Sequence, residues 1–220
     1  MKGRVATVVI SAALAGVIAA TPAQAQVNYY TQGWFTSSSW PTCNGSAPAA
    51  GAPLSSTCVT PAYTLDYMAK AANPGLIGSG SVVSLGTFAL TVTGSATVSP
   101  GASLFTLAIQ QLNPTTGTGT LVGSLSGAVM MNDDFSSMIW VPSAQTVTIG
   151  SSTYTLIFND RGPAANKGIA IAVNNDGTPT SIQAIVATNA VPEPASVVLL
   201  GTGLLGILGV TRRHRKFASA

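Results

Sequence analysis

Residues that favour turns interrupt the central part of this chain at short intervals, and this spacing restricts the fold more than any other feature. They cluster at Pro74-Gly75, Pro100-Gly101, Asn113-Pro114, Gly117-Thr118-Gly119, Gly162-Pro163 and Asn174-Asn175-Asp176-Gly177. Glycine, proline and asparagine supply the backbone angles that tight turns require. No convincing helical pattern lies between these turns, so we expect many short strands.

The segments between the turns alternate apolar and polar residues, as half-buried strands do. Residues 103–111 and 153–159 show the pattern most clearly. Their apolar sides are expected to face a core and consist of Phe105, Leu107, Ile109, Tyr154, Leu156 and Phe158. Further strands are expected at residues 82–93, 121–130, 135–141, 145–149, 169–173 and 181–187, the last two forming a hairpin around an Asn-Asp-Gly turn.

About eight or nine strands within residues 26–190 predict an all-β fold, a single antiparallel β-sandwich of immunoglobulin-like or jelly-roll type. This span of 165 residues is long enough for one domain that buries nearly 70% of its unfolded surface. A solenoid is the alternative. Its support is the sequence similarity between residues 78–82 and 117–121, and a single similar pair does not make a repeat array.

The charge distribution excludes a nucleic-acid-binding surface. The chain has nine basic and six acidic residues, and only eight of these lie between residues 26 and 190: Asp66, Lys70, Asp133, Asp134, Asp160, Arg161, Lys167 and Asp176. With three basic and five acidic residues, this middle region has a net charge of −2, so the overall +3 comes from the two ends. The apolar fraction of 46% also argues against a disordered chain.

The N-terminus has the three parts of a secretory signal peptide. Lys2 and Arg4 precede an apolar run over residues 5–20, and Ala23-Gln24-Ala25 follows as a cleavage site of small residues. We therefore expect cleavage after Ala25. An uncleaved membrane anchor is the alternative, but the spacing of the A-x-A pattern favours removal.

The C-terminus combines a short motif, an apolar run and a basic cluster. Pro192, Glu193 and Pro194 precede sixteen uncharged residues, 195–210, and the basic residues Arg212, Arg213, Arg215 and Lys216 follow. A helix of sixteen residues is about 24 Å long, slightly less than the roughly 30 Å hydrocarbon layer of a bilayer. Basic residues that flank a membrane helix stay on the cytoplasmic side. The precursor is therefore expected to be tethered with its middle region outside.

These last 30 residues or so resemble the PEP-CTERM sorting signal of Gram-negative bacteria. The resemblance implies that exosortase, an integral-membrane transpeptidase-like enzyme, recognises the signal and removes the tail. It also implies a surface or matrix protein of bacteria that make extracellular polysaccharide. A plain single-pass anchor is the alternative, in which Pro-Glu-Pro would be a stiff turn ahead of the helix.

The two cysteines, Cys43 and Cys58, are expected to form a disulfide, because export places them in an oxidising compartment. The bond would close a loop of about 15 residues and contribute roughly 3 kcal/mol. Residues 44–57 are mostly Gly, Ala, Pro and Ser and can bury little surface, which explains the need for a covalent link. No histidine or second cysteine pair accompanies them, so metal binding is disfavoured.

Five aromatic residues crowd a stretch of twelve: Tyr29, Tyr30, Trp34, Phe35 and Trp40. Exposed rings could stack on sugar faces. Aromatic residues of a first strand more often pack into the core, and we favour that interpretation.

Catalytic residue types are missing from the middle region. The single histidine, His214, lies in the basic tail, and the single glutamate, Glu193, lies in the sorting signal. Neither a Ser-His-Asp triad nor a histidine zinc site can form there. Asp133 and Asp134 are adjacent and would point to opposite faces of a strand, while Asp160 and Asp176 occupy turn sequences. We expect no enzyme activity, cofactor or metal; calcium on Asp and Asn oxygens stays open, without a matching loop motif.

The sequence thus predicts a signal peptide (1–25), an exported β domain (26–190) and a sorting signal (191–220) with its motif (192–194), membrane helix (195–210) and basic cytoplasmic tail (211–220). Thr, Ser, Asn and Gln on the solvent faces can pair with sugar hydroxyls. The alternative explanation is that an exported surface simply tolerates a low charge. We expect a structural or glycan-associating protein of the cell surface or extracellular matrix, with a processing enzyme, the membrane and extracellular polysaccharide as partners. The alternatives are a secreted carbohydrate-active enzyme that uses Asp carboxylates and a plain membrane-anchored protein.

Overall fold

The computed structural model describes residues 25–38, 41–43, 45, 52–72, 77–130, 137–159, 168–173, 178–189, 200, 201, 203 and 204. Within these ranges the chain forms eleven strands and one short 3-10 helix: β1 (Asn28–Ser37), η1 (Pro41–Cys43), β2 (Ser56–Val59), β3 (Tyr63–Met68), β4 (Ser81–Val92), β5 (Ala96–Asn113), β6 (Gly117–Val129), β7 (Ser137–Pro142), β8 (Thr146–Ile149), β9 (Ser152–Ile157), β10 (Ile169–Ala172) and β11 (Thr180–Thr188). All of them belong to one compact unit, Ala25–Asn189. The all-β prediction is confirmed.

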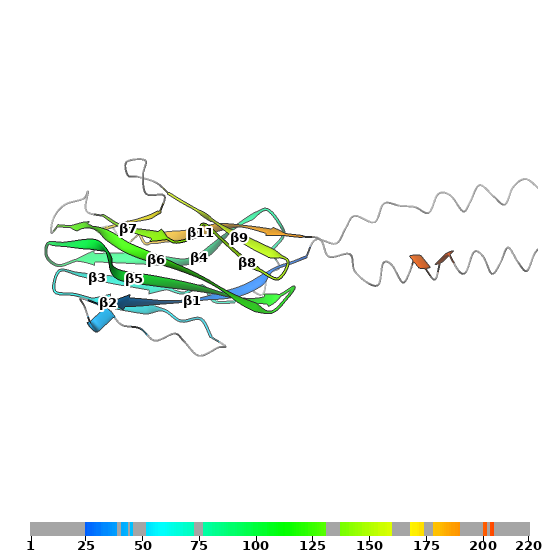
Figure 1. Cartoon of the computed structure of the whole chain (residues 1–220), viewed down its shortest axis with the longest axis horizontal. Helices are drawn as coiled ribbons and strands as arrows, with labels where there is room; N and C mark the ends of the chain where they lie inside the picture. The colour runs from blue at the N-terminus through cyan, green and yellow to red at the C-terminus, as the bar shows by residue number, and fades with distance from the viewer. Residues whose placement is uncertain are drawn as a thin grey trace, which may run out of the picture. The chain divides into compact units, whose positions relative to one another are not determined.

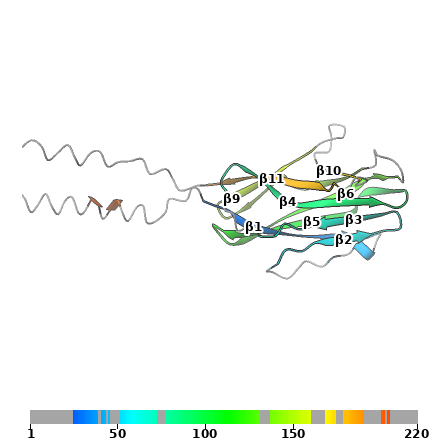
Figure 2. The ribbon, with the colours of Figure 1, turned by 180° about the vertical axis from the view of Figure 1, so that it is seen from behind.

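The strands form two sheets in which the named pairs are antiparallel (Figure 1 and Figure 2). A five-stranded sheet has the order β1-β5-β6-β7-β10, and a six-stranded sheet has the order β2-β3-β4-β11-β9-β8. This order differs from the immunoglobulin order, in which the first and second strands are neighbours in one sheet. Here β1 and β2 lie in different sheets.

The apolar core lies between the two sheets. Phe105 of β5 contacts Tyr67 of β3 and Phe88 of β4, which belong to the other sheet, at ring-centroid distances of 4.9 and 4.8 Å. The alternation in the sequence placed this core correctly, because five of the six side chains predicted to face inward are fully buried and Phe158 is partly buried against them.

Glycines allow the two layers to approach closely at particular points. A Cβ atom on Gly33 of β1 would lie 2.5 Å from the Tyr67 ring and 2.6 Å from the Phe105 ring. A Cβ atom on Gly119 of β6 would lie 2.4 Å from Val147 of β8. These distances are shorter than carbon atoms tolerate, so the packing of rings and aliphatic groups requires glycine at both positions.

The predicted hairpin around the Asn-Asp-Gly turn is wrong. β10 pairs with β7 in the five-stranded sheet, whereas β11 pairs with β4 and β9 in the six-stranded sheet. The two segments therefore belong to opposite layers, and an isolated bridge between Leu90 and Val173 marks the place where the chain changes layer. Turn chemistry indicated where the chain bends but not which partner each strand takes.

The predicted flanking helices fall largely outside the described residues. The signal segment 1–24 is not among them, and only Leu200, Gly201, Gly203 and Leu204 of the C-terminal apolar run are, all in helical conformation. Among the described residues, no helix has the length and apolar character needed to cross a bilayer.

Three buried tyrosines join the layers through hydrogen bonds. The Tyr29 hydroxyl donates to the Ser84 carbonyl at 2.6 Å, and the Tyr67 hydroxyl donates to Oγ1 of Thr31, on β1, at 2.8 Å. The Tyr154 hydroxyl donates to Oε1 of Gln111 at 2.9 Å. Burial raises the pKa of all three hydroxyls above the ordinary value for tyrosine, because their charged form would be poorly solvated.

We expect these tyrosines to destabilise the protein in strong base. Their pKa values are higher in the folded protein than in the unfolded chain, where tyrosine ionises near pH 10. Their contribution to stability is therefore fully present below about pH 10 and is lost as the pH rises above that value. Urea denaturation should give a constant midpoint from pH 7 to 9 and a falling one from pH 10 to 12, with phenolate absorbance appearing together with unfolding. A midpoint that stays constant through pH 12 would contradict this expectation.

Candidate functional site

The last strand ends within a network of hydrogen bonds at one end of the unit. The Thr188 amide donates to the Ser79 hydroxyl at 2.9 Å, and the Asn189 amide donates to the Ser151 carbonyl at 3.0 Å. The Thr188 hydroxyl donates to the Ala25 carbonyl at 3.2 Å, so the first and last described residues of the unit meet here. In Figure 1 this is the right-hand end, where β1 and β11 come together.

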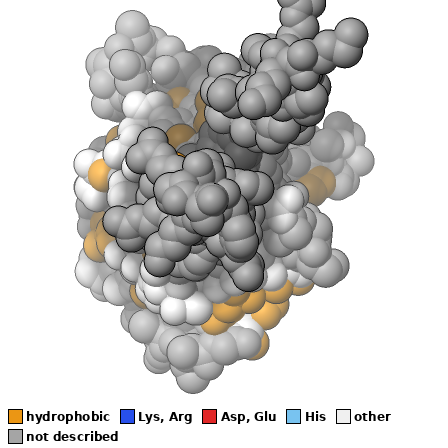
Figure 3. All heavy atoms as spheres, turned by 90° about the vertical axis from the view of Figure 1, so that its right-hand side faces the viewer, with side chains coloured by type: hydrophobic (Ala, Val, Ile, Leu, Met, Phe, Trp, Pro, Cys, Tyr) orange, Lys and Arg blue, Asp and Glu red, His pale blue; other side chains and the backbone are white. Residues whose placement is uncertain are grey.

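Two turns complete this end of the unit. A Cβ atom on Gly150, in the turn between β8 and β9, would lie 2.8 Å from the Thr115 side chain, in the turn between β5 and β6. We call Ser79, Gly80, Thr115, Thr116, Gly150, Ser151 and Asn189 the terminal rim. Figure 3 faces this end, and the described side chains that it shows are hydrophobic or uncharged polar.

The residues predicted to direct processing lie next to this rim in the sequence. Ala25, the predicted signal cleavage position, is described, whereas Ala23 lies outside the described residues. The predicted sorting residues Pro192, Glu193 and Pro194 and the basic residues Arg212, Arg213, Arg215 and Lys216 also lie outside them. Their roles stay predictions from the sequence.

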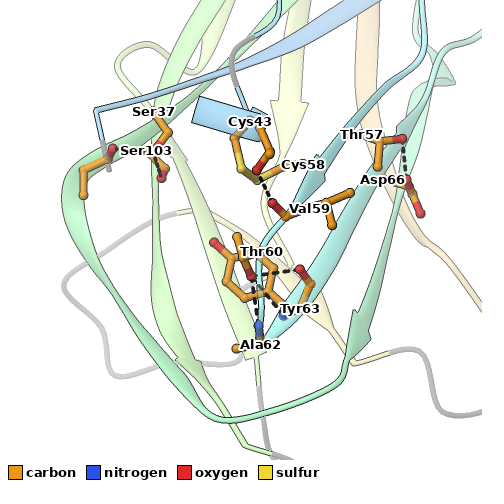
Figure 4. The surroundings of a disulfide bond; sticks show 12 residues. Ser37, Cys43, Thr57, Cys58, Val59, Thr60, Ala62, Tyr63, Asp66 and Ser103 are labelled. Atoms are coloured by element: carbon orange, nitrogen blue, oxygen red, sulfur yellow. Dashed lines mark hydrogen bonds between the residues drawn. A yellow bond between two sulfur atoms is a disulfide. The ribbon is translucent and has the colours of Figure 1, made fainter. Parts of the chain in front are cut away.

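Cys43 and Cys58 form the predicted disulfide, which links η1 to β2 (Figure 4). Both residues are buried. Around the bond, the Thr42 hydroxyl donates to the Val59 carbonyl, and the Thr60 hydroxyl accepts the Tyr63 amide at 3.0 Å. The disulfide and its polar neighbours thus fix the connection between the two sheets at the end of β1.

The disulfide also closes a loop that covers the free edge of β1. We call Gly45 and residues 52–55, the described parts of this loop, the edge strap. The Gly45 amide donates to the Phe35 carbonyl at 2.7 Å, and the Gly33 amide donates to the Leu54 carbonyl at 3.1 Å. Nε2 of Gln32 donates to the Ala52 carbonyl at 2.6 Å. Because an unpaired strand edge can pair with another chain, the strap protects this side of the five-stranded sheet.

Replacing Cys58 with serine is expected to release the edge strap. The chain-entropy model gives a loss of about 3 kcal/mol in the free energy of unfolding for a loop of this length. Hydrogen exchange should accelerate more at the Gly33 and Leu54 amides than at the Leu107 amide in the buried part of β5. The double variant Cys43→Ser/Cys58→Ser serves as a control for the unpaired thiol. Equal acceleration at all three amides would show that the disulfide supports the whole unit rather than the strap.

The aromatic cluster of the first strand belongs mainly to the interior. Tyr29 and Phe35 are each 1% exposed, and Tyr30 is 6% exposed. Trp34 is half-buried, and Trp40 lies outside the described residues. The expectation that these rings pack into the core therefore holds for Tyr29 and Phe35, whereas Tyr30 is buried on the opposite side of β1, the side of Gln32.

The described residues contain only two charged side chains, Asp66 and Lys70. Asp66 accepts a hydrogen bond of 2.6 Å from the Thr57 hydroxyl on the neighbouring strand. The other predicted carboxylates, Asp133, Asp134, Asp160 and Asp176, lie outside the described residues. Within the described part of the chain, no three His, Cys, Asp or Glu side chains come together as metal ligands would.

The outer surface of the six-stranded sheet is rich in hydroxyl groups. Along its strands, buried side chains alternate with half-buried or exposed ones. The half-buried or exposed positions include ten threonines and serines: Thr57, Thr64, Ser84, Thr87, Thr91, Thr146, Thr148, Thr153, Thr155 and Ser181. We call this set the hydroxyl face. Threonines oppose one another in the register, as Thr146 does Thr155, and the hydroxyls of Thr148 and Thr153 lie 3.1 Å apart.

Comparison with known proteins identifies the C-terminal segment. The family model of the PEP-CTERM protein-sorting motif matches residues 190–216. No curated protein and no solved structure matches the chain significantly. The match covers the three parts found in the sequence, namely Pro192 to Pro194, the apolar run and the basic cluster. The chain therefore carries a PEP-CTERM protein-sorting motif, which directs an exported protein to the cell surface through processing by an exosortase.

Proposed function

We propose that the protein is a non-enzymatic component of the cell surface or extracellular matrix, and that its β unit associates with neutral polysaccharide. The hydroxyl face is the observation that supports this proposal most strongly. Hydroxyl groups both donate and accept hydrogen bonds, as sugar hydroxyls do. Among the described residues on the strands of the six-stranded sheet, Asp66 is the only charged one, and the Thr57 hydroxyl donates a hydrogen bond to its carboxylate.

The spacing of the hydroxyl face suits an extended chain of sugars. Neighbouring strands lie about 4.8 Å apart, and residues on one face of a strand repeat about every 6.7 Å. Thr146, Thr148, Thr153 and Thr155 occupy adjacent positions of this grid on β8 and β9. Val82 and Ile185, which oppose each other on the same sheet and are 58% and 41% exposed, offer apolar contacts for the C–H faces of sugar rings.

In this proposal the two packed sheets form a single β-sandwich that serves as an inert scaffold. The precursor is tethered in the inner membrane by residues 195–210 until the sorting motif is processed. Residues 1–25 are removed at export, so the β unit between the two processing signals is the part that remains. Its function at the surface then depends on what its faces bind.

The test uses mature protein purified from its native cells and the exopolysaccharide of the same cells. Wild-type protein is expected to sediment with the polysaccharide, and replacing Thr146, Thr148, Thr153 and Thr155 with valine is expected to abolish this. The matched control replaces Thr118 and Thr120, on the outer side of the five-stranded sheet, with valine. Sedimentation that survives the quadruple substitution would refute the hydroxyl face as the binding site.

The same mixture tests the enzymatic alternative. A glycoside hydrolase needs two carboxyl groups about 5 to 10 Å apart and releases reducing ends from its substrate. We expect no increase in reducing ends during incubation with the native polysaccharide. A steady increase would show that the protein is a carbohydrate-active enzyme. Mass analysis of the purified protein would at the same time report both cleavages and any attached glycan.

A further inference from the structure

We propose that the terminal rim is a docking surface for the exosortase-type enzyme that processes the sorting motif. This inference rests on the sorting function and deepens it, because it assigns part of enzyme recognition to the folded β unit. Recognition would then involve two surfaces of the substrate: the motif itself and the rim from which the chain leaves the last strand.

The first argument is the length of chain between the folded unit and the motif. β11 is hydrogen-bonded to its end, and the Asn189 amide is held by the Ser151 carbonyl. Pro192 follows only three residues later. An extended chain advances at most about 3.6 Å per residue, so an enzyme that holds Pro192 works within about 11 Å of Asn189. At this distance, a protein that binds the motif lies close to the end of the β unit.

The second argument is that the strand end is fixed. Ser79 holds both polar groups of the Thr188 backbone, with its hydroxyl 2.9 Å from the amide nitrogen and 3.4 Å from the carbonyl oxygen. The Gly80 amide donates to the Val186 carbonyl at 2.6 Å, which ties the same turn to β11. The end of β11 is therefore held in place within the rim, and the chain leaves the β unit from a fixed point.

The third argument is the chemistry of the rim. Its side chains are hydroxyls, an amide or hydrogen, and none is charged. Burying a charge in a contact is costly unless a partner compensates it, and interface cores are depleted of charged residues for that reason. An uncharged polar rim can lie against the enzyme without that cost.

The test introduces a charge at an exposed rim position. Thr116 is exposed and lies in the turn between β5 and β6, so Thr116→Glu should leave the core intact. We expect removal of the tail to slow roughly 10-fold, because changes within one interface alter association over one to three decades. The measurement is a pulse–chase experiment in a host that encodes the matching enzyme, following loss of a tag after Ala220.

Two controls separate docking from other causes. Ser95→Glu places the same charge in the exposed connection at the opposite end of β4, and it should be processed at the wild-type rate. Inserting twelve Gly and Ser residues between Asn189 and Ala190 should make processing insensitive to Thr116→Glu, because the rim then no longer needs to lie against the enzyme. Urea midpoints of all variants report whether each one is folded.

The outcomes are distinct. A Thr116→Glu variant processed at the wild-type rate would overturn the proposal, and so would one that is slowed equally with and without the inserted linker. Retention of the C-terminal tag by wild-type protein would instead refute the sorting function, and the docking proposal would fall with it. Slowing that occurs only at the native linker length supports the rim as the docking surface.

Discussion

Replacing Pro192, Glu193 and Pro194 with alanine is expected to leave the C-terminal tail on essentially every copy of the protein. The three residues lie within the segment that matches the sorting-motif family, and they precede the apolar run without being part of it. Membrane insertion depends on the uncharged residues 195–210 and on the basic residues after them, which the substitution does not touch. The variant should therefore reach the membrane and remain there with its C-terminal tail attached.

Fractionation with two reporters measures this effect. An antibody against the β unit follows the whole population, and a tag after Ala220 follows only unprocessed chains. Wild-type protein should lose the tag and leave the membrane fraction, whereas the triple variant should keep both signals there. A Glu193→Gln variant shows whether the carboxylate is required or only the two prolines. If wild-type and triple-alanine proteins lose the tag equally, the tripeptide is not part of the signal.

The sequence predicted the inward faces of the strands but not their partners. Alternation in residues 103–111 and 153–159 identified the buried side chains, because in a strand successive side chains point to opposite faces. The same pattern contains no information on pairing, which is why β10 and β11 were expected to form one hairpin and instead lie in different sheets. The strands β2 and β3 were missed altogether, although Tyr63, Leu65 and Tyr67 alternate with Thr64 and Asp66 in β3.

Burial on the outward side of β1 was also unpredictable from alternation. Gln32 points away from the core and is nevertheless only 1% exposed, because its side chain binds the Ala52 carbonyl of the edge strap. The two cysteines predicted that a loop would be closed. They did not indicate that this loop would lie along the edge of the first strand, since that position depends on contacts distant in sequence.

The candidate site also has one part that the sequence predicts and one part that it does not. The sorting motif was readable because its recognition depends on a short local order of residues, and its family match confirms that order. The terminal rim could not be predicted from the sequence, because it brings together turns at residues 79–80, 115–116 and 150–151 around the end of β11. Only the folded chain shows that the first strand begins where the last strand ends.

Phe105→Ala is expected to cost about 3 to 5 kcal/mol in the free energy of unfolding, which is a large share of the 5 to 15 kcal/mol typical of a domain. Phe105 is fully buried and occupies the centre of the core. Its ring lies 5.0 Å from that of Phe35, 4.9 Å from Tyr67, 4.8 Å from Phe88 and 5.4 Å from Trp140, measured between ring centroids. Removing it leaves a cavity lined by four rings that belong to both sheets.

Leu104→Ala is the matched control, because Leu104 is the preceding residue of the same strand, faces outward and is 36% exposed. Substitutions at such surface positions usually change stability by about 0.5 kcal/mol or less. Urea denaturation of the two variants and the wild-type protein compares the inward and outward positions directly. The large loss at Phe105 should come with a reduced yield of exported protein, since unfolded chains are degraded. Similar losses for both variants would mean that the two sheets do not pack through Phe105, and that the layers are joined mainly by the buried tyrosine hydrogen bonds and the disulfide.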